Sequence, residues 1–209
     1  MYVSKTPYLL KQFRKQSLLW EMPASEEQNP PALYLSFDDG PIPEITPQIL
    51  DILDEFNAKA TFFMVGDNVR KHPSEFQMVK DRGHAIGNHG YHHLSGWGTD
   101  TEAYVEDVEK ANQLIQSSLF RPPYGRIRLQ EIKALSPKYK IVMWSVLSAD
   151  YDQNISSEQC LSNVLTHAKD GSIIVFHDSL KASQNLLYSL PQVLKHFSNK
   201  GFVFKSLTV

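Results

Sequence analysis

The sequence predicts an α/β protein in which a parallel sheet curls into a barrel. Short apolar runs alternate with longer amphipathic stretches, and polar residues follow the apolar runs at their carboxyl ends. Alternating strands and helices favour a parallel sheet, and with right-handed crossovers about seven such units can curl into a barrel. Parallel strands end at one rim, so polar residues distant in sequence are expected to meet there.

The expected strands are the short apolar runs. Uninterrupted apolar character, as in residues 172–176, is typical of a strand buried on both faces. In chain order the expected strands are residues 32–37, 61–65, 84–88, a short piece at Phe120, then 141–146, 172–176 and 202–204.

The expected helices lie between these runs, where apolar residues recur with a helical period. They are residues 46–56, 74–82, 101–119, 129–135, 157–168 and 186–197.

Composition favours a single domain. The chain has 209 residues, 42% of them hydrophobic, which is enough for a substantial core. The sequence has no Ser/Gly tract, charge block or low-complexity stretch that would indicate a linker, and no internal repeat. We expect one domain over residues 1–209, with residues 1–30 as an N-terminal arm.

Charge, cysteine content and the N-terminal sequence exclude several classes of protein. The formal net charge is −2, with 21 Lys and Arg against 23 Asp and Glu, which argues against a general nucleic-acid binder. The lone Cys160 excludes an internal disulfide and is expected to be a small buried residue. Basic residues interrupt residues 1–20, so these do not resemble a secretory signal, and no segment has transmembrane length. We therefore expect a cytoplasmic protein.

The tract SFDDGP, residues 36–41, ends the first expected strand with two adjacent carboxylates, Asp38 and Asp39. Burying unpaired charge is unfavourable, so this pair indicates a bound cation. Taken alone, the same tract is equally typical of a turn, since Asp, Gly and Pro each favour turns.

Candidate partners for that cation lie in GNHGYHH, residues 87–93. His89 and His93 are four residues apart, so in a helical turn both imidazoles would project from one side, and Asp39 would complete an Asp-His-His site. Three protein ligands with one open position are the catalytic pattern for zinc. By itself, a His pair at this spacing is also typical of a solvated surface.

Three further tracts follow in order: FRPPYG at residues 120–125, WSVLSADY at 144–151 and IIVFHD at 173–178. The five together resemble the polysaccharide deacetylase family, also described as NodB-like or carbohydrate esterase family 4. The resemblance covers the chain apart from the N-terminal arm and the final helix and strand. It implies a distorted or incomplete (β/α) barrel of seven strands, in agreement with the alternation of elements.

The resemblance also implies roles for the first two tracts. Asp38 would be the general base and Asp39 the metal carboxylate, with His89 and His93 as the imidazole ligands. Zinc suits such a site best, and cobalt, nickel or iron could occupy the same ligands.

The remaining tracts supply the other implied roles. Arg121 would pair with Asp38 and hold it ionised, and the backbone N–H of Tyr124 would face the developing oxyanion. Asp150 would orient His177, the general acid. On local context alone, Arg121 is typical of the surface, Asp150 of a loop or helix N-cap, and His177 of a strand end that carries either a structural or a catalytic histidine.

Two departures from the family pattern stand out. The family usually has Ser or Thr directly after the first metal histidine, where its hydroxyl braces the loop, whereas this chain has Gly90. The fourth motif usually has Trp after its Asp and another Asp three residues earlier, whereas here these positions hold Tyr151 and Leu147. The first departure concerns the rigidity of the ligand loop, and the second concerns the groove wall and substrate choice.

The other aromatic and imidazole side chains are assigned no catalytic role. Trp97 could stack on a sugar face or fill a loop core. The remaining histidines are expected to be wall, solvated or locally hydrogen-bonded residues: His72, His84, His92, His167 and His196.

These expectations converge on a divalent-metal-dependent hydrolase that removes N-acetyl groups from amino sugars of a peptidoglycan- or chitin-type saccharide, or a precursor, and releases acetate. Two alternatives remain at this point. One keeps the site but cleaves an O-acetyl ester or a small amide, and the other is a non-catalytic carbohydrate- or metal-binding relative.

Overall fold

The computed structural model describes residues 4–7, 17–26 and 29–208. Its centre is strand β2 (Ala32–Asp38), which is buried along nearly all its length. The other strands are β1 (Leu18–Leu19), β3 (Thr61–Met64), β4 (Ala85–Asn88), β5 (Leu119–Phe120), β6 (Lys140–Val142), β7 (Val146–Leu147), β8 (Ile173–His177) and β9 (Val203–Phe204).

The strands form a parallel sheet in the order β1-β6-β5-β4-β3-β2-β8-β7, and β9 adds to β2. Within the described residues β1 and β7 do not pair with each other, so the barrel is incomplete. Strand β7 lies at one end of this order and the preceding strand β6 lies second from the other end, so residues 143–145 carry the chain across the opening of the curled sheet. The predicted incomplete (β/α) barrel is confirmed.

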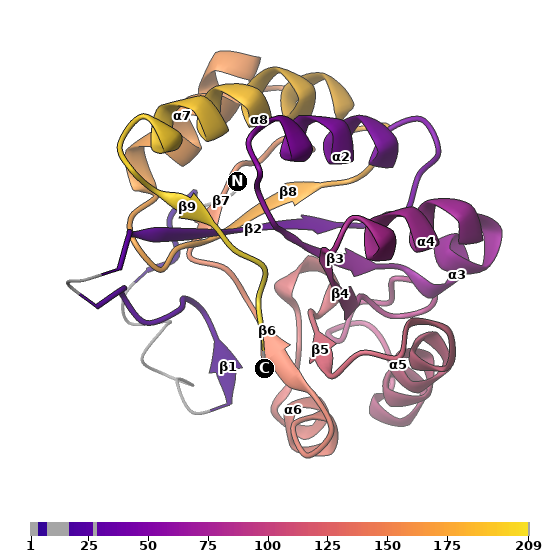
Figure 1. Cartoon of the computed structure of the whole chain (residues 1–209). Coiled ribbons are helices and arrows are strands. Elements are labelled where there is room, and N and C mark those ends of the chain that lie inside the picture. The colour runs from indigo at the N-terminus through magenta and orange to yellow at the C-terminus, as the bar shows by residue number, and fades with distance from the viewer. Residues whose placement is uncertain (1–3, 8–16, 27–28, 209) are drawn as a thin grey trace.

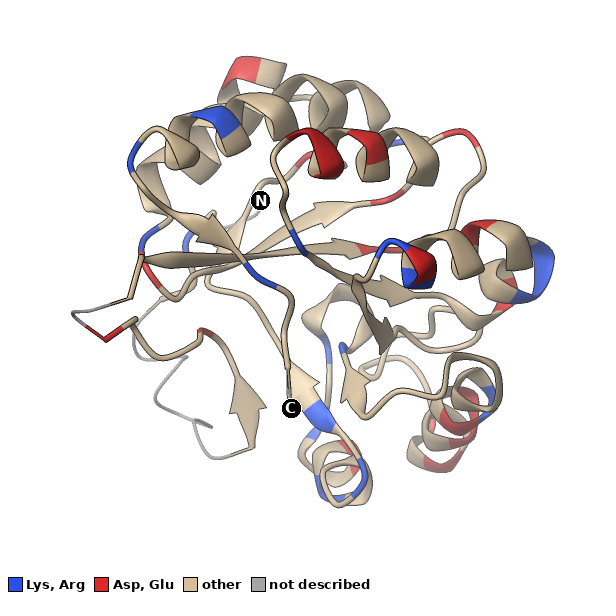
Figure 2. Cartoon of the chain, viewed as in Figure 1, with Lys and Arg blue, Asp and Glu red and all other residues tan. Residues whose placement is uncertain are grey.

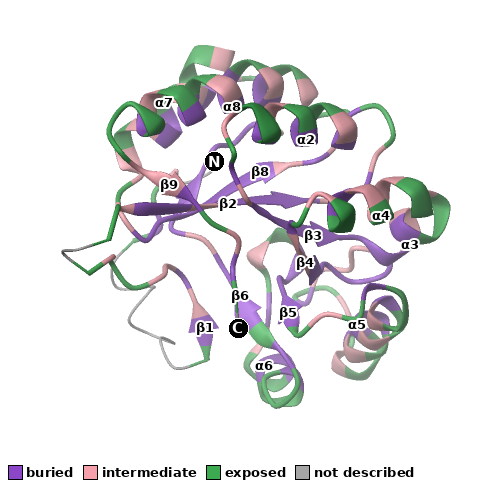
Figure 3. Cartoon of the chain, viewed as in Figure 1, coloured by how far each residue is buried: buried purple, intermediate pink, exposed green. Residues whose placement is uncertain are grey.

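Helices surround the sheet in an arc that runs from α7 through α8, α2, α3 and α5 to α6 (Figure 1). They are α2 (Thr46–Glu55), α3 (Gly66–Lys71), α4 (Pro73–Asp81), α5 (Thr101–Ile115), α6 (Leu129–Leu135), α7 (Ser157–His167) and α8 (Ser183–Ser198), with a short 3-10 turn η1 (Pro123–Gly125). Figure 3 shows the strands buried and the outward faces of the helices exposed.

Apolar and polar side chains alternate along β2, so the apolar ones face the core and the polar ones face the interior of the barrel. Leu33, Leu35 and Phe37 belong to the main apolar cluster, and the Phe37 ring stacks on Phe62 of β3 at 4.9 Å. Because successive strand residues face opposite sides, Ser36 and Asp38 point the other way, into the barrel. The apolar face therefore anchors the strand whose polar face carries the chemistry.

The arm is tied into the sheet rather than lying free of it. Leu18 and Leu19 pair with β6, while the Ser4 carbonyl accepts from the Leu147 amide at 2.9 Å beside β7. The Asp170 carboxylate accepts from the backbone amides of Ser25 and Ala32 at 2.7 and 2.8 Å. The described parts of the arm thus contact both ends of the open sheet.

Several boundaries differ from expectation. The run 141–146 is divided into β6 and β7, because the Met143 amide donates to Leu19 and the Ser145 amide donates to Ile173 on a different strand. Helix α5 ends at Ile115 rather than 119, because Gln116 adopts a left-handed conformation. The sequence pattern missed β1, α3 and η1, each of which is short.

Cys160 is fully buried in α7 as a free thiol. None of the helices in the described ranges combines the length and the apolar character needed to cross a membrane. Figure 2 shows Lys and Arg interspersed with Asp and Glu over the helices, which accords with the formal charge of −2.

Candidate active site

The polar residues at the strand ends converge on one pocket of about 810 Å³. Asp38 ends β2 and His177 ends β8, and these two residues are register partners on adjacent strands. The pocket lining also includes Asp39, His89, His93, Tyr124, Arg126, Met143, Trp144, Leu147, Tyr151 and, from the arm, Thr6, Pro7 and Trp20. The shared rim predicted for these strand ends is therefore present.

Asp39, His89 and His93 offer three ligand atoms that all lie within 4.8 Å of one another. The Asp39 Oδ1 atom is 3.3 Å from His93 Nε2 and 3.7 Å from His89 Nε2. This oxygen is buried and accepts no hydrogen bond. Burial alone would raise the pKa of Asp39, but the contact with His93 and the neighbouring imidazoles outweigh it and hold the pKa below its ordinary value.

His89 is oriented by a backbone contact. Its Nδ1 lies 2.8 Å from the Arg121 carbonyl oxygen. A carbonyl can only accept, so Nδ1 carries the proton and Nε2 keeps a free lone pair facing the carboxylates. Burial lowers the pKa of His89 to about 4, which keeps the imidazole neutral near pH 7.

These features fit a divalent metal ion. One carboxylate and two imidazoles suit zinc and other first-row ions. The buried, unbonded Asp39 oxygen and the His89 lone pair are both suited to a cation. A hydrogen bond from the other His nitrogen is the usual support for a ligating imidazole.

The His89–His93 segment is not helical, which corrects the expected helical turn. Gly90 and His93 both have left-handed φ angles, 76° and 57°, and the stretch has no helix assignment. Backbone turns, rather than a four-residue helical spacing, bring the two imidazole centroids to 4.9 Å.

A buried carboxylate that sequence reasoning missed holds this loop in place. Asp107 of α5 accepts from the amides of Tyr91 at 2.8 Å and His92 at 3.1 Å, and its Oδ1 is 2.6 Å from His92 Nδ1. Asn88 adds a second contact, accepting from the Gly90 amide at 2.8 Å while donating to the Val108 carbonyl of α5. The only sequence signal was an acidic residue on the apolar face of a helix.

Asp38 forms a buried ion pair with Arg121. An Arg121 Nη1–Asp38 Oδ1 contact of 2.6 Å joins them, and the same nitrogen donates to Ser36 Oγ at 2.8 Å. Arg121 is fully buried, its guanidinium lies 4.0 Å over the Phe63 ring, and it donates to the Met143 carbonyl at 3.1 Å. The surface alternative for Arg121 is thus wrong.

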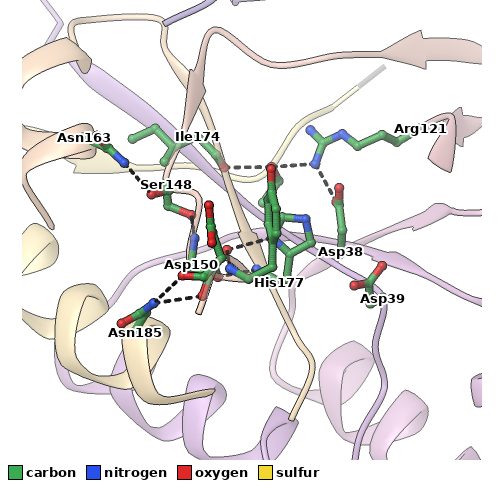
Figure 4. A network of polar contacts seen from close by, with 12 residues as sticks. Asp38, Asp39, Arg121, Ser148, Asp150, Asn163, Ile174, His177 and Asn185 are labelled. Atoms are coloured by element: carbon green, nitrogen blue, oxygen red, sulfur yellow. Dashed lines mark hydrogen bonds and ion pairs between the residues drawn. The ribbon is translucent and has the colours of Figure 1, made fainter. Parts of the chain in front are cut away.

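His177 and Asp150 form the second pair. Asp150 Oδ1 is 2.7 Å from His177 Nδ1, and Oδ2 accepts from the His177 amide at 2.7 Å. Figure 4 shows His177 between Asp150 and the Asp38–Asp39 pair. Burial opposes the imidazolium, but the charge and hydrogen bond of Asp150 outweigh it and raise the pKa of His177 to about 9.

Two asparagines from the outer helices support the loop of Asp150, and no sequence pattern indicated either of them. Asn185 of α8 donates to the Asp150 carbonyl at 3.1 Å, and Asn163 of α7 donates to the Ser148 carbonyl at 2.9 Å (Figure 4). The loop that carries the carboxylate is therefore anchored to the helix layer.

The departures from the family pattern lie where expected. Leu147 and Tyr151 both line the pocket, and the Tyr151 ring packs edge-on against His177 at 4.8 Å. Tyr124 has a left-handed φ of 59°, and its ring packs edge-on against His93 at 4.6 Å.

The remaining histidines lie outside the pocket lining. His84 is buried rather than solvated: its Nδ1 accepts from the Ala60 amide at 3.2 Å, and burial lowers its pKa to about 4. His92 turns toward Asp107. His72, His167 and His196 are of intermediate exposure.

The comparisons with known proteins agree with this geometry. Residues 25–139 match the family model described as polysaccharide deacetylase. A peptidoglycan-N-acetylglucosamine deacetylase of Bacillus cereus is 32% identical over 196 residues, covering 90% of each chain. A chitooligosaccharide deacetylase of Azorhizobium caulinodans is 32% identical over 171 residues, covering 78% of this chain and 81% of that protein. A solved peptidoglycan N-acetylglucosamine deacetylase, in complex with 4-naphthalen-1-yl-N-oxidanyl-benzamide, has a TM-score of 0.86 at 30% identity and covers 97% of this chain and 95% of that one.

Carboxylates, imidazoles and a buried arginine lie together at the carboxyl ends of the strands of this half-barrel. This is where barrel enzymes have their active sites. The chain belongs to the polysaccharide deacetylase family, as its five motifs predicted. It is accordingly a hydrolase.

Proposed function

We propose that this protein is a metal-dependent N-deacetylase that acts on N-acetylated amino sugars of a peptidoglycan- or chitin-type saccharide and releases acetate. One observation carries the proposal: the Asp39, His89 and His93 ligand atoms lie within 4.8 Å of one another in the pocket that Asp38 and His177 also line. The names of the relatives support an acetamide on a sugar as the bond that is cleaved.

Asp39, His89 and His93 would hold the ion, with zinc as first choice and cobalt, nickel or iron as possible occupants of the same ligands. When bound, the ion supplies a water of lowered pKa and polarises the acetamide carbonyl.

The chain's own residues move the protons. Asp38 accepts the proton of the attacking water, and Arg121 fixes its position through the 2.6 Å contact. The backbone N–H of Tyr124 donates to the oxyanion that forms on the carbonyl oxygen. His177 then gives its proton to the departing amine, so the C–N bond breaks to yield acetate and a free amino sugar.

The orientation of His177 suits this role. Because Nδ1 is engaged by Asp150 at 2.7 Å, Nε2 remains for the pocket. A pKa near 9 keeps the imidazole protonated at neutral pH, which a general acid requires before the amine departs.

The test is Asp38→Asn, measured by acetate release from chitooligosaccharides and by metal content. We expect acetate release to fall below a few per cent of wild type while bound zinc is unchanged, because Asp38 is outside the ligand group. Asp152→Asn, which changes a carboxylate of intermediate exposure in the loop after Asp150, is the matched control. If purified Asp38→Asn keeps substantial activity, Asp38 is not the base, and if acetylated xylan is the better substrate of the wild type, the O-acetyl esterase alternative is correct.

A further inference from the structure

Three side chains form an exposed strip at the mouth of the pocket. Tyr124 and Arg126 line the pocket, and Trp97 lies next to Arg126, whose guanidinium carbon is 5.2 Å from the Trp97 ring and 5.8 Å from the Tyr124 ring. Trp97 is 66% exposed and Tyr124 is 60% exposed. We call Tyr124, Arg126 and Trp97 the aromatic strip.

The exposure of Trp97 decides between its two earlier interpretations. A tryptophan that fills a loop core would be largely buried, and this one is among the most exposed large apolar side chains of the described residues. Single exposed apolar residues are common and need no explanation. This one is continuous with a catalytic pocket through Arg126.

The loop that presents Trp97 is anchored on both sides. The Gly96 amide donates to the Arg126 carbonyl at 3.2 Å, and the Gly98 amide closes a turn on Ser95 at 3.1 Å. A Cβ on Gly96 would come within 2.4 Å of Glu131 Oε2, so the loop packs tightly on α6.

The far side of the loop is fixed as well. Arg128 donates to the Thr99 carbonyl and forms a 2.8 Å ion pair with Glu131, which is fully buried. An exposed indole on an anchored loop loses little conformational freedom when a ligand covers it, which favours binding.

The chemistry of the strip indicates its ligand. Aromatic rings offer flat apolar area with polar N–H or O–H groups at the edge, and the guanidinium offers several N–H donors with no acceptor. Within the described residues no carboxylate lies within ion-pair distance of Arg126. A pyranose ring, with apolar C–H faces and a rim of hydroxyls, complements both features.

We propose that the aromatic strip binds a sugar residue adjacent, in the same glycan chain, to the one whose acetamide is in the pocket. The inference rests on the proposed function and assigns it a substrate of at least two sugars. The strip begins at the ligand group itself, because the Tyr124 ring packs on His93 at 4.6 Å. Trp97 is not among the residues that line the pocket, so an amino sugar confined to the pocket leaves the indole uncovered.

The experiment compares Trp97→Ala with wild type on N-acetylated chitooligosaccharides from the shortest that is deacetylated to the pentamer. We expect the KM for the pentamer to rise about 5- to 10-fold with kcat nearly unchanged, because one stacking contact between the indole and a sugar is lost. The KM for the shortest substrate should stay the same. Trp97→Phe should recover part of the pentamer affinity. Tyr188→Ala, which removes a 40% exposed aromatic from α8 away from the pocket lining, is the control.

Each outcome separates the two proposals. Equal KM values for Trp97→Ala and wild type on every length, or an equal loss on all lengths, would overturn the strip as a sugar site. If wild type releases acetate from none of these oligomers, the proposed function fails first. Direct titration of the Asp38→Asn variant with the pentamer, with and without Trp97→Ala, measures the same affinity difference without turnover.

Discussion

A side chain at position 90 would place its Cβ 3.0 Å from Oδ2 of Asp107. The carboxylate of Asp107 thus occupies the space next to Gly90, and it accepts from the amides of the two residues that follow. The loop between the two ligand histidines is braced from α5 instead of by a hydroxyl at position 90. The departure from the family pattern is therefore matched by a compensating contact.

Asp107→Asn tests this brace. The amide group retains the shape, but it removes the negative charge and leaves one acceptor oxygen where the carboxylate has two. Oδ2 accepts from both backbone N–H groups and Oδ1 lies 2.6 Å from His92 Nδ1, so one of these two sets of contacts is lost. Since partners of metal ligands commonly affect metal affinity by about 10-fold or more, we expect the zinc dissociation constant to rise by at least that factor. Competition titration with a chromophoric chelator measures it. Glu106→Gln, an exposed acid on the same helix, serves as control, and an unchanged constant for Asp107→Asn would show that the brace does not affect the metal.

Gly90→Ala should be unfavourable for two reasons. Residue 90 has a φ of 76°, which a non-glycine residue adopts at a penalty of about 1–2 kcal/mol, and the added Cβ would contact Asp107. We expect the free energy of unfolding to fall by that amount or more. Gly98→Ala is the matched control, because a Cβ there meets nothing within 4 Å. Chemical denaturation compares them, and equal stability of the two variants would contradict the argument.

The sequence predicted the sheet and most helices because their apolar patterns report burial directly. The expected strand 32–37 differs from β2 by one residue at one end, and 172–176 differs from β8 by one residue at each end. The short elements were not predicted, because a strand of two residues such as β1 is too short to show a repeating hydrophobic pattern. The division of residues 141–146 into two strands was not predicted, because both halves are buried and apolar. They differ only in the strand with which each one pairs, β5 for β6 and β8 for β7.

The proposed ligand and acid–base residues were identified from motifs, which contain them at fixed spacing. The residues that hold them were not. Asp107, Asn163 and Asn185 act from helices α5, α7 and α8, and their contacts depend on how each helix packs on the sheet. A single sequence contains no signal for such packing, so a helix carboxylate is as typical of the surface as of a buried brace.

The pH dependence of turnover should follow the Asp150–His177 pair. In the folded protein the pKa of His177 is raised to about 9 from an ordinary 6.5, so the stability from this pair is fully present below pH 6.5 and is lost as pH rises through 9. Asp150→Asn removes the charge that raises this pKa and leaves the burial that lowers it. We therefore expect the alkaline limb of the kcat–pH profile to move to lower pH.

Asp152→Asn is the control for that profile, because Asp152 lies outside the pocket lining and contacts Asn154 rather than His177. Its alkaline limb should coincide with that of the wild type. An Asp150→Asn profile that is lower at all pH values, with an unchanged alkaline limb, would mean that Asp150 positions the loop without tuning the acid.

Metal binding should stabilise the fold by a free energy that grows with the logarithm of the metal concentration. An ion that binds only the native state adds about 2.7 kcal/mol at 100 times its dissociation constant, which for a chain of this size corresponds to a rise in Tm of about 5–10 °C. We expect zinc to produce this rise in chelator-treated protein and His93→Ala to abolish most of it, since His93 supplies one of the three ligand atoms. His167→Ala, at the end of α7 and outside the pocket lining, should respond as wild type does. A zinc-dependent rise that persists in His93→Ala would place the ion elsewhere, because no arrangement of the remaining two ligands preserves the same affinity.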